Sequence, residues 1–504
     1  MSISKTIRLH ANDNVVVCRE KITAGTELQE ENLIAQEEVP SGYKISTKKI
    51  KKGDPILKYN AVIGYAKYDI APGCMMHTHN IDFKDVSLDY AFCTEYQPTV
   101  PQTSEFFWGY VRADGKAATR NYIGVFAMSN CAATVVRKIA DFFGPEQLAA
   151  YPQIDGVVPF IISTGCGMES SGEPMDCLRR TISGYMNHPN IAAVITVSLG
   201  CERNNLEEFF AAMGRPEGKE CISFVMQEEG GTQATIQKGI AAVEKMLPAA
   251  NSIQRERVPL KHLTVALECG GSDSFSGLSA NPALGVAVTK LVQQGGTAIL
   301  SEISEIFGAE YLLTRRAATP EIAQKLLDRI AWWQAYSRGC DTQINGHVTP
   351  GNQAGGITNV LEKSLGGIKK GGETGLMEVY RYAEPVKVNG LVFMDTPGYD
   401  PVAVTGQVAG GANLVAFTTG RGSCFGSVPA PTCKLATNTA LYEKMQGDMD
   451  INCGRIIDGQ KTIEELGEEI FQELIKIASG KKTKSELLGV GCDEFQPWHL
   501  GVLS

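Results

Sequence analysis

The sequence predicts an α/β protein with a small β-rich N-terminal barrel and a large, mostly parallel, Rossmann-like α/β region. Two patterns support this prediction. Short strand-like runs separated by glycine or proline fill the first 90 residues, and repeats of this kind are typical of a small barrel. Beyond residue 106, apolar strand-like runs alternate with longer helical stretches, which is the pattern of a parallel sheet with crossover helices.

The chain of 504 residues divides into four predicted segments. Residues 1–90 form the β module, and residues 91–106 form a linker with little periodicity. Residues 107–385 form an α/β domain whose strands end at cysteines, and residues 386–504 form a C-terminal α/β domain. Within the last segment, residues 461–480 predict an amphipathic helix packed on the core.

Composition excludes several classes of protein. A net charge of −9 argues against nucleic acid as the main partner, because a nucleic-acid-binding face is basic. No stretch approaches the roughly 20 apolar residues that cross a bilayer, so we expect no membrane partner. The N-terminal residues MSISKTIRLHANDN lack the apolar core of a signal peptide. We therefore expect a cytoplasmic enzyme that acts on a small molecule, and a homo-oligomer.

Four of the 14 cysteines directly follow or end predicted strands and lie beside glycine or another small residue: Cys131, Cys166, Cys201 and Cys269. The carboxyl ends of parallel strands share one edge of a sheet, so these thiols are expected to converge. Thiolates are soft ligands that suit iron, zinc or an iron–sulfur cluster. The alternative is that they are small residues at crowded turns.

The pair His77 and His79 is the only close pair among the seven histidines. In an extended segment, residues two apart point to the same face, so both imidazoles are expected to address one site. Histidine transfers protons near neutral pH and also ligates metals. The alternative is an ordinary exposed β-edge.

Further polar residues lie at glycine-rich turns or next to predicted strands, where they offer the donors and charges that bind a polyhydroxy acid. Each has an alternative role in turn structure. Arginine in particular grips a carboxylate through two parallel hydrogen bonds. The candidate substrate-binding residues are Arg120, Asn121, Ser272, Asp273, Asn352, Lys363 and Arg421. The chain has no Walker loop, no GxSxG and no GxGxxG after its first strand, so nucleotide-binding and serine-hydrolase functions lose their usual support.

Seven motifs give the chain a family resemblance. They are an N-terminal module ending in HTHN, GYVRADGKAATRNY, STGCG, SLGCE, LECGGSDSFSGLSANPALG, TPGNQAGGITNVLEKSLG and FTTGRG. With them the chain resembles, over nearly its full length, the altronate and galactarate dehydratase family of sugar-acid hydro-lyases, whose N-terminal module is a SAF domain. The HTHN and SEIFGAEYLLTRRA segments resemble the altronate branch.

The resemblance implies an iron-dependent hydro-lyase that dehydrates a hexonate, D-altronate, to 2-keto-3-deoxy-D-gluconate. Galactarate dehydration and sulfolactate desulfonation remain alternatives within this layout, and a non-enzymatic sugar-binding role would use only the first module. Thr349 and Ser423-Cys424 depart from the family motifs and leave the exact acid open.

Within this implied mechanism, Cys166, Cys201 and Cys269 are the expected iron–sulfur ligands, with Cys131 as a reserve. His77 and His79 are the proton-transfer candidates, or ligands of a second metal. Arg421 and Asn352 are expected to hold the substrate carboxylate and hydroxyls. Mononuclear Fe²⁺ or Mn²⁺ on oxygen and histidine ligands is the rival to a cluster.

Overall fold

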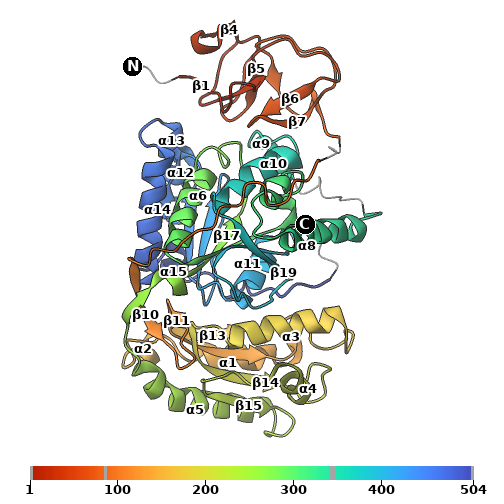
Figure 1. Cartoon of the computed structure of the whole chain (residues 1–504). Helices are drawn as coiled ribbons and strands as arrows, with labels where there is room; N and C mark the ends of the chain where they lie inside the picture. The colour runs from red at the N-terminus through yellow and green to blue at the C-terminus, as the bar shows by residue number, and fades with distance from the viewer. Residues whose placement is uncertain (1–3, 85–87, 341–347, 501–504) are drawn as a thin grey trace.

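The computed structural model describes residues 4–84, 88–340 and 348–500. Three sheet-containing regions are stacked along the molecule, with the β-rich N-terminal module at one end (Figure 1). The third region in sequence lies in the middle and the second lies at the far end. The predicted mixed α/β fold with a large parallel sheet is confirmed.

The N-terminal module consists of small antiparallel sheets, in the orders β1-β2-β5-β8, β6-β7-β9 and β3-β4. Apolar residues of β2 and β5, such as Val16 and Ile45, form its own buried core. The strands are β1 (Thr6–Ile7), β2 (Val15–Cys18), β3 (Glu27–Leu28), β4 (Leu33–Ile34), β5 (Lys44–Ser46), β6 (Pro55–Lys58), β7 (Ala61–Ala66), β8 (Met75–Met76) and β9 (Ile81–Asp82).

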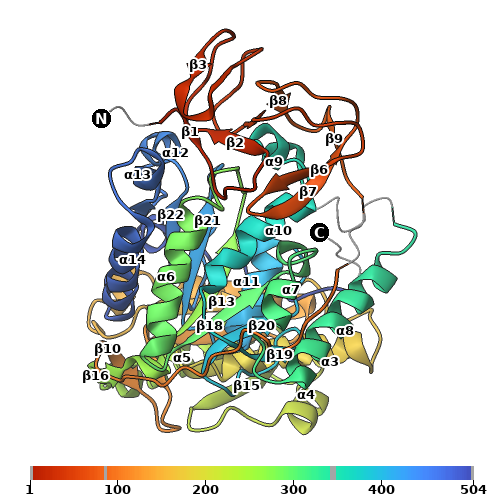
Figure 2. The ribbon, with the colours of Figure 1, turned by 45° about the horizontal axis from the view of Figure 1, so that its top comes forward.

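The predicted linker has no helix or strand between residues 88 and 105. It runs along the third region rather than through solvent (Figure 2). The Cys93 amide donates to the Thr314 carbonyl at 3.0 Å, and the Gln102 amide donates to the Gln293 carbonyl at 2.7 Å. These backbone bonds tie the linker down before it enters β10.

The second region is built on a four-stranded parallel sheet in the order β13-β12-β14-β15, beside a three-stranded antiparallel sheet β11-β10-β16. Its central strands are almost continuously apolar because both faces are covered. The strands are β10 (Phe106–Val111), β11 (Ala117–Ala118), β12 (Tyr122–Ala127), β13 (Gly156–Phe160), β14 (Ile191–Ser198), β15 (Cys221–Val225) and β16 (Glu256–Pro259). The helices are α1 (Ala133–Asp141), α2 (Pro145–Leu148), α3 (Glu173–Met186), α4 (Leu206–Met213) and α5 (Thr232–Asn251).

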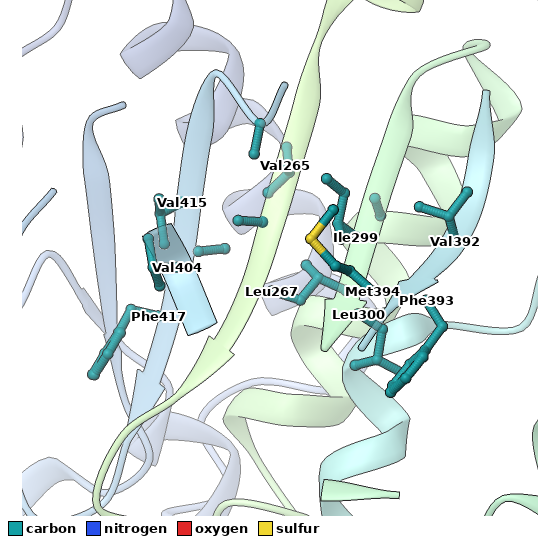
Figure 3. Packing of buried hydrophobic residues seen from close by; sticks show 14 of the residues in the cluster. Val265, Leu267, Ile299, Leu300, Val392, Phe393, Met394, Val404, Val415 and Phe417 are labelled. Carbon is teal, nitrogen blue, oxygen red and sulfur yellow. The ribbon is translucent and has the colours of Figure 1, made fainter. Parts of the chain in front are cut away.

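The third region is built on a seven-stranded, all-parallel sheet in the order β19-β20-β18-β17-β21-β22-β23. Figure 3 shows the aliphatic and aromatic side chains of its central strands, including Leu267, Ile299 and Val415, which are fully or almost fully buried. The strands are β17 (Thr264–Cys269), β18 (Thr297–Ser301), β19 (Leu376–Tyr380), β20 (Gly390–Met394), β21 (Leu414–Thr419), β22 (Thr432–Ala436) and β23 (Ile451–Asn452).

Helices cover this sheet on both faces. The predicted amphipathic helix near the C-terminus is confirmed as α14, which packs against α6. The helices are α6 (Ala280–Gln293), α7 (Tyr311–Thr314), α8 (Pro320–Tyr336), α9 (Pro350–Ala354), α10 (Val360–Gly367), α11 (Asp400–Ala409), α12 (Thr439–Lys444), α13 (Gly454–Ile457), α14 (Ile463–Ala478) and α15 (Lys484–Leu488).

The predicted domain boundary between residues 385 and 386 does not coincide with a boundary in the structure. Strands β17, β18 and β19 lie before it, and they share one sheet with β20 to β23, which lie after it. The break between the α/β regions lies instead between β16 and β17. Periodicity identifies each strand locally, but pairing between distant strands is a tertiary property that it does not report.

The chain reverses its direction of progress across the seven-stranded sheet. From β17 it continues to β18, then to the edge strand β19 and back to β20 on one side, and it then crosses to β21, β22 and β23 on the other. Neighbouring strands β17 and β21 therefore form the topological switch point, and ligands of open α/β sheets bind beyond the carboxyl ends of such strands. The N-terminal module lies over this edge, next to α9 and α10 (Figure 2).

A buried ion triad joins the N-terminal module to α10. The Nζ atoms of Lys44 and Lys58 lie 2.9 Å and 2.8 Å from the carboxylate of Glu362. Burial by itself would raise the pKa of Glu362, but the two lysines outweigh burial and hold it well below its usual range. Asn359 adds a hydrogen bond of 2.7 Å from Nδ2 to the Ile63 carbonyl. The module is therefore docked by charge pairing within the protein interior.

We expect Glu362→Gln to destabilise the docked module, because it leaves two buried ammonium groups without their counter-ion. Breaking a buried ion pair typically costs about 3–5 kcal/mol. Denaturant unfolding and limited proteolysis of the 91–106 linker measure the effect, with the exposed Glu443→Gln as control. Equal stability of the two variants would contradict the interpretation.

Candidate active site

Three carboxylates meet at the carboxyl edge of the seven-stranded sheet. Glu268 lies near the end of β17, Glu302 directly follows β18, and Asp400 opens α11 after β20. One oxygen atom from each lies within 4.8 Å of the others, and this is the one such group of three potential metal ligands in the described residues. Parallel strands bring together side chains that are 132 positions apart, from 268 to 400 in the sequence.

Burial and mutual repulsion raise the pKa values of these carboxylates. Glu268 is fully buried, and burial followed by Glu302 and Asp400 raises its pKa well above the usual value. Burial, reinforced by Glu305, raises the pKa of Glu302 to about 8. Burial raises the pKa of the more accessible Asp400 to about 6. Within the described chain, Oε1 of Glu268 and Oε2 of Glu302 are buried without a hydrogen-bond partner.

The backbone of Glu302 is also unusual. Its φ is 66° and its ψ is 107°, a conformation that non-glycine residues rarely adopt. The Glu302 amide is held by a 3.0 Å hydrogen bond to Oγ1 of Thr396. Strain of this kind persists only where the surroundings enforce it, and it clusters at functional sites.

Two lysines lie beside the carboxylates. Lys363 and Lys370 each place Nζ 3.0 Å from a different oxygen of the fully buried Glu305. Burial would lower the pKa of Lys363, but Glu305 and Glu302 outweigh it and leave the pKa raised. Both ammonium groups therefore stay charged and supply positive potential where the three carboxylates meet.

The loop after β17 is held by interactions within the protein. The Asp273 carboxylate accepts hydrogen bonds from Ser276, Thr437 and Asn438. A Cβ atom on Gly420 would overlap the Asp273 carboxyl group, so glycine is required for this approach. Asp273 therefore orders the loops after β17, β21 and β22.

Ser272 and Asn352 belong to the same loop system. The Ser272 hydroxyl lies 2.7 Å from the Cys269 sulfur, and its carbonyl accepts a hydrogen bond of 2.9 Å from Asn352 Nδ2. Oδ1 of Asn352 accepts from the Thr349 backbone in the capping box of α9. Most of the Asn352 amide is therefore engaged in loop structure.

Arg421 lies two residues after the end of β21, the strand that pairs with β17 on the side away from β18. Its amide donates to the Gly271 carbonyl at 2.9 Å, which joins the two loops of the switch point. The side chain is exposed, and its guanidinium forms no hydrogen bond or ion pair within the described residues. Arg421 is thus free to bind an anion.

The two predicted histidines lie in a turn between β8 and β9, so the expected extended conformation is wrong. His79 is exposed, whereas His77 is half-buried against Tyr43, with ring centroids 4.7 Å apart. Burial, followed by Lys44, lowers the pKa of His77 to about 4. Its Nδ1 is buried without a partner in the described chain. His77 is therefore a neutral imidazole close to the Lys44–Glu362 pair.

The four predicted cysteines do not form one group. Cys269 is buried in the seven-stranded sheet, while Cys131, Cys166 and Cys201 are exposed on the four-stranded sheet. Burial raises the pKa of Cys269, which keeps it a thiol. The strand ends were predicted correctly, but the two sheets were not distinguishable in the sequence.

Arg120 and Asn121 do not line the candidate site. They precede β12, at the amino edge of the four-stranded sheet. The buried Arg120 guanidinium donates to Glu486 and to the carbonyls of Thr119, Ile477 and Lys481, which uses all its donors. Asn121 is fully buried and bonded to Arg112, Gln153 and Ala250. Both residues fix the packing of β12 instead of binding substrate.

Sequence reasoning missed Glu268, Glu302, Asp400, Glu305 and Lys370. A signal was available for two of them, because Glu268 and Glu302 lie at the ends of apolar runs, as the cysteines do. The same strand-end argument applies to acidic residues as to thiols. No local pattern marked Asp400 or Lys370.

Comparison with known proteins shows that the sequence matches three family models. Residues 4–84 match the altronate/galactarate dehydratase SAF domain, and residues 109–251 match the second domain of D-galactarate dehydratase/altronate hydrolase. Residues 260–503 match the D-galactarate/altronate dehydratase C-terminal domain.

Full-length relatives agree. An altronate dehydratase of Bacillus subtilis (strain 168) is 33% identical over 95% of this chain and 96% of the relative. The altronate dehydratase of Escherichia coli (strain K12) is 33% identical, again over 95% of this chain and 96% of the relative. The chain belongs to the altronate/galactarate dehydratase family.

A second branch of the family is equally similar. The galactarate dehydratase (L-threo-forming) of Escherichia coli (strain K12) is 34% identical over 94% of this chain and 93% of the relative. Membership of the altronate/galactarate dehydratase family makes the chain an enzyme of the hydro-lyase class. The resemblance seen in the motifs is thereby confirmed. Within the described residues, no helix is long and apolar enough to span a membrane.

The raised pKa of Glu302 predicts a pH-dependent stability in the cation-free chain. The unfolded state loses this proton near pH 4.5, whereas the folded state keeps it until about pH 8. The stabilising contribution is therefore fully present below pH 4.5 and is lost as the pH rises to about 8. Calorimetry in EDTA should show a melting temperature that falls over this window, and Glu302→Gln should flatten the fall. The same fall in melting temperature with pH in the variant and in the parent chain would contradict this prediction.

Proposed function

We propose that the chain dehydrates a hexonate, D-altronate, to 2-keto-3-deoxy-D-gluconate at the carboxyl edge of β17. The observation that carries the proposal is the group of Glu268, Glu302 and Asp400, beside two charged lysines and below the N-terminal module. Dehydration removes a weakly acidic proton next to a carboxylate and expels a hydroxyl group. Both steps require concentrated, well-positioned charge.

Arg421 is the proposed anchor for the substrate carboxylate. Its exposed guanidinium is unpaired among the described residues, and Arg–carboxylate pairing is bidentate and orienting. The Gly271–Arg421 backbone bond fixes its base beside the loop that follows β17. The hydroxyl-bearing carbons of the acid would then extend toward Asp400, the most accessible of the three carboxylates.

The carboxylate group fits a divalent cation. Glu268 and Glu302 each carry a buried oxygen atom without a hydrogen-bond partner in the described chain, and three oxygen donors suit hard or intermediate ions such as Fe²⁺ and Mn²⁺. When bound there, such an ion would neutralise negative charge that develops on the substrate. This donor set supports the mononuclear alternative, rather than an iron–sulfur cluster, at this edge.

His77 is the proposed proton-transfer group. Its low pKa makes it a neutral imidazole at physiological pH, and Nδ1 has no partner in the described chain. Nδ1 takes the proton from C2 of the hexonate, and the resulting imidazolium returns a proton to the C3 hydroxyl as it leaves as water. The enol that remains tautomerises to the 2-keto-3-deoxy acid. Lys363 and Lys370, held by Glu305, stabilise negative charge during these steps.

Replacement of His77 should separate its role from that of its neighbour. We expect His77→Gln to lower kcat by about 10²- to 10⁴-fold, the usual contribution of a general acid–base group. The exposed His79→Gln is the matched control and should retain near-parental kcat. Steady-state kinetics with D-altronate, at melting temperatures shown to be equal, provide the measurement. Equal kcat for both variants would exclude His77 as the base.

Cation binding should depend on the carboxylates and release protons. Mn²⁺ titration followed by electron paramagnetic resonance should show at least ten-fold weaker binding in Glu302→Gln and Asp400→Asn than in the parent chain. Affinity should rise as the pH rises from 6 to 8, because a ligating carboxylate must be deprotonated. Cys269→Ser is the control, since its thiol lies at the same edge but outside the carboxylate group. Unchanged Mn²⁺ affinity in both carboxylate variants would contradict the assignment.

A substrate panel tests the proposed reaction itself. Purified full-length chain, supplied with Fe²⁺ or Mn²⁺, should form a 2-keto-3-deoxy acid from D-altronate faster than from galactarate or glucarate. Desulfonation of (2R)-sulfolactate should not be detectable. A preference for galactarate would assign the chain to the galactarate dehydratase branch. Activity on none of the acids would overturn the proposal. Cytoplasmic location and a homo-oligomeric state remain predictions.

A further inference from the structure

Three cysteines are left unused by the carboxylate site. Cys131, Cys166 and Cys201 follow β12, β13 and β14, which are neighbours in the order β13-β12-β14. All three thiols are exposed and free. They lie at the same carboxyl edge of the four-stranded sheet, the position at which open parallel sheets bind ligands.

The loops that carry these cysteines are bonded to one another. The Asn130 amide donates to the Thr164 carbonyl at 2.9 Å, and the Asn204 amide donates to the Gly165 carbonyl at 3.0 Å. Nδ2 of Asn204 also donates to the Met128 carbonyl at 2.9 Å. A Cβ atom on Gly165 would overlap Met128, so the tight contact before Cys166 requires glycine. Each cysteine is therefore one to three residues from a contact that fixes its loop against a neighbouring loop.

Local contacts position the cysteine-bearing loops. Nε2 of Gln227 donates a 3.5 Å hydrogen bond to the sulfur of Cys201, and such bonds stabilise thiolates. The buried carboxylate of Glu202 accepts from Ser198 and from the amides of Leu199 and Gly200, which stiffens the turn before Cys201. Cys131 lies in the short turn that leads into α1.

Spacing distinguishes between kinds of metal site. The three sulfur atoms do not all lie within 4.8 Å of one another. A single zinc ion, with bonds of about 2.3 Å to sulfur, would hold them closer than that. An iron–sulfur cluster spreads its thiolates over separate iron atoms and tolerates wider spacing.

We propose that Cys131, Cys166 and Cys201 hold an iron–sulfur cluster of the [4Fe–4S] class, at a site separate from the carboxylates. Each thiol releases its proton to solvent and forms one sulfur–iron bond. The fourth iron then keeps a position open to water or another small ligand. Cys269 takes no part, because it is buried in the other sheet. The site does not rest on the proposed dehydration.

Reconstitution of the full-length chain tests the site. Chain purified without oxygen is incubated with ferrous iron, sulfide and a thiol reductant, and then desalted. Bound iron and acid-labile sulfide are measured together with visible absorption and the electron paramagnetic resonance of the reduced sample. The variants are Cys131→Ser, Cys166→Ser, Cys201→Ser and the triple substitution. Controls are Cys424→Ser, an exposed cysteine of the third region, and the buried Cys269→Ser.

Equal amounts of iron and sulfide should bind to the parent chain and to both controls. Each single substitution should lower cluster content several-fold, and the triple substitution should abolish it at unchanged melting temperature. Glu302→Gln should keep the cluster, which separates this result from failure of the dehydratase proposal. Iron without sulfide, a cluster retained in the triple variant, or a cluster lost only in Cys269→Ser would overturn the inference.

Discussion

Two adjacent residues of α10, Glu362 and Lys363, carry buried charges that face two different partners. Glu362 is paired with Lys44 and Lys58 of the N-terminal module. Lys363 is paired with Glu305, next to the three carboxylates at the end of β17. Because an unpaired buried charge is costly, neither contact can be released cheaply. One helical turn thereby couples docking of the module to the electrostatic balance of the candidate active site.

That coupling bears on the proposed role of the β-rich module in the reaction. His77 lies in a turn of the module, and its pKa responds to burial, Lys44 and Glu362. The same docking that holds α10 therefore keeps this imidazole neutral. Arg421 is fixed by the loops joined at Gly271. The substrate would thus be enclosed between the module and the switch point of the seven-stranded sheet.

The proposed oxygen ligands and the proposed sulfur ligands lie on different sheets. Glu268, Glu302 and Asp400 gather on the seven-stranded sheet, whereas the exposed thiols of Cys131, Cys166 and Cys201 follow strands of the four-stranded sheet. Hard and soft donors select different metals, so two edges of one protein can hold different inorganic groups without competition. A measured requirement for iron would therefore not identify the edge that binds it. Sulfide content and Mn²⁺ affinity distinguish them.

Local sequence patterns were sufficient to predict the strands that precede Cys131, Cys166 and Cys201 and the strand that ends at Cys269, because apolar runs and glycine act within a few residues. They also predicted the linker, α14 and the family. Local patterns did not show that β17 to β23 form one sheet. Nor did they show that the Arg120 guanidinium pairs with Glu486, which lies 366 positions away in the sequence. Those outcomes depend on which strands pair and which charges meet after folding. The carboxylate site is of this kind, since Glu268, Glu302 and Asp400 become neighbours only when three distant strands align at one edge.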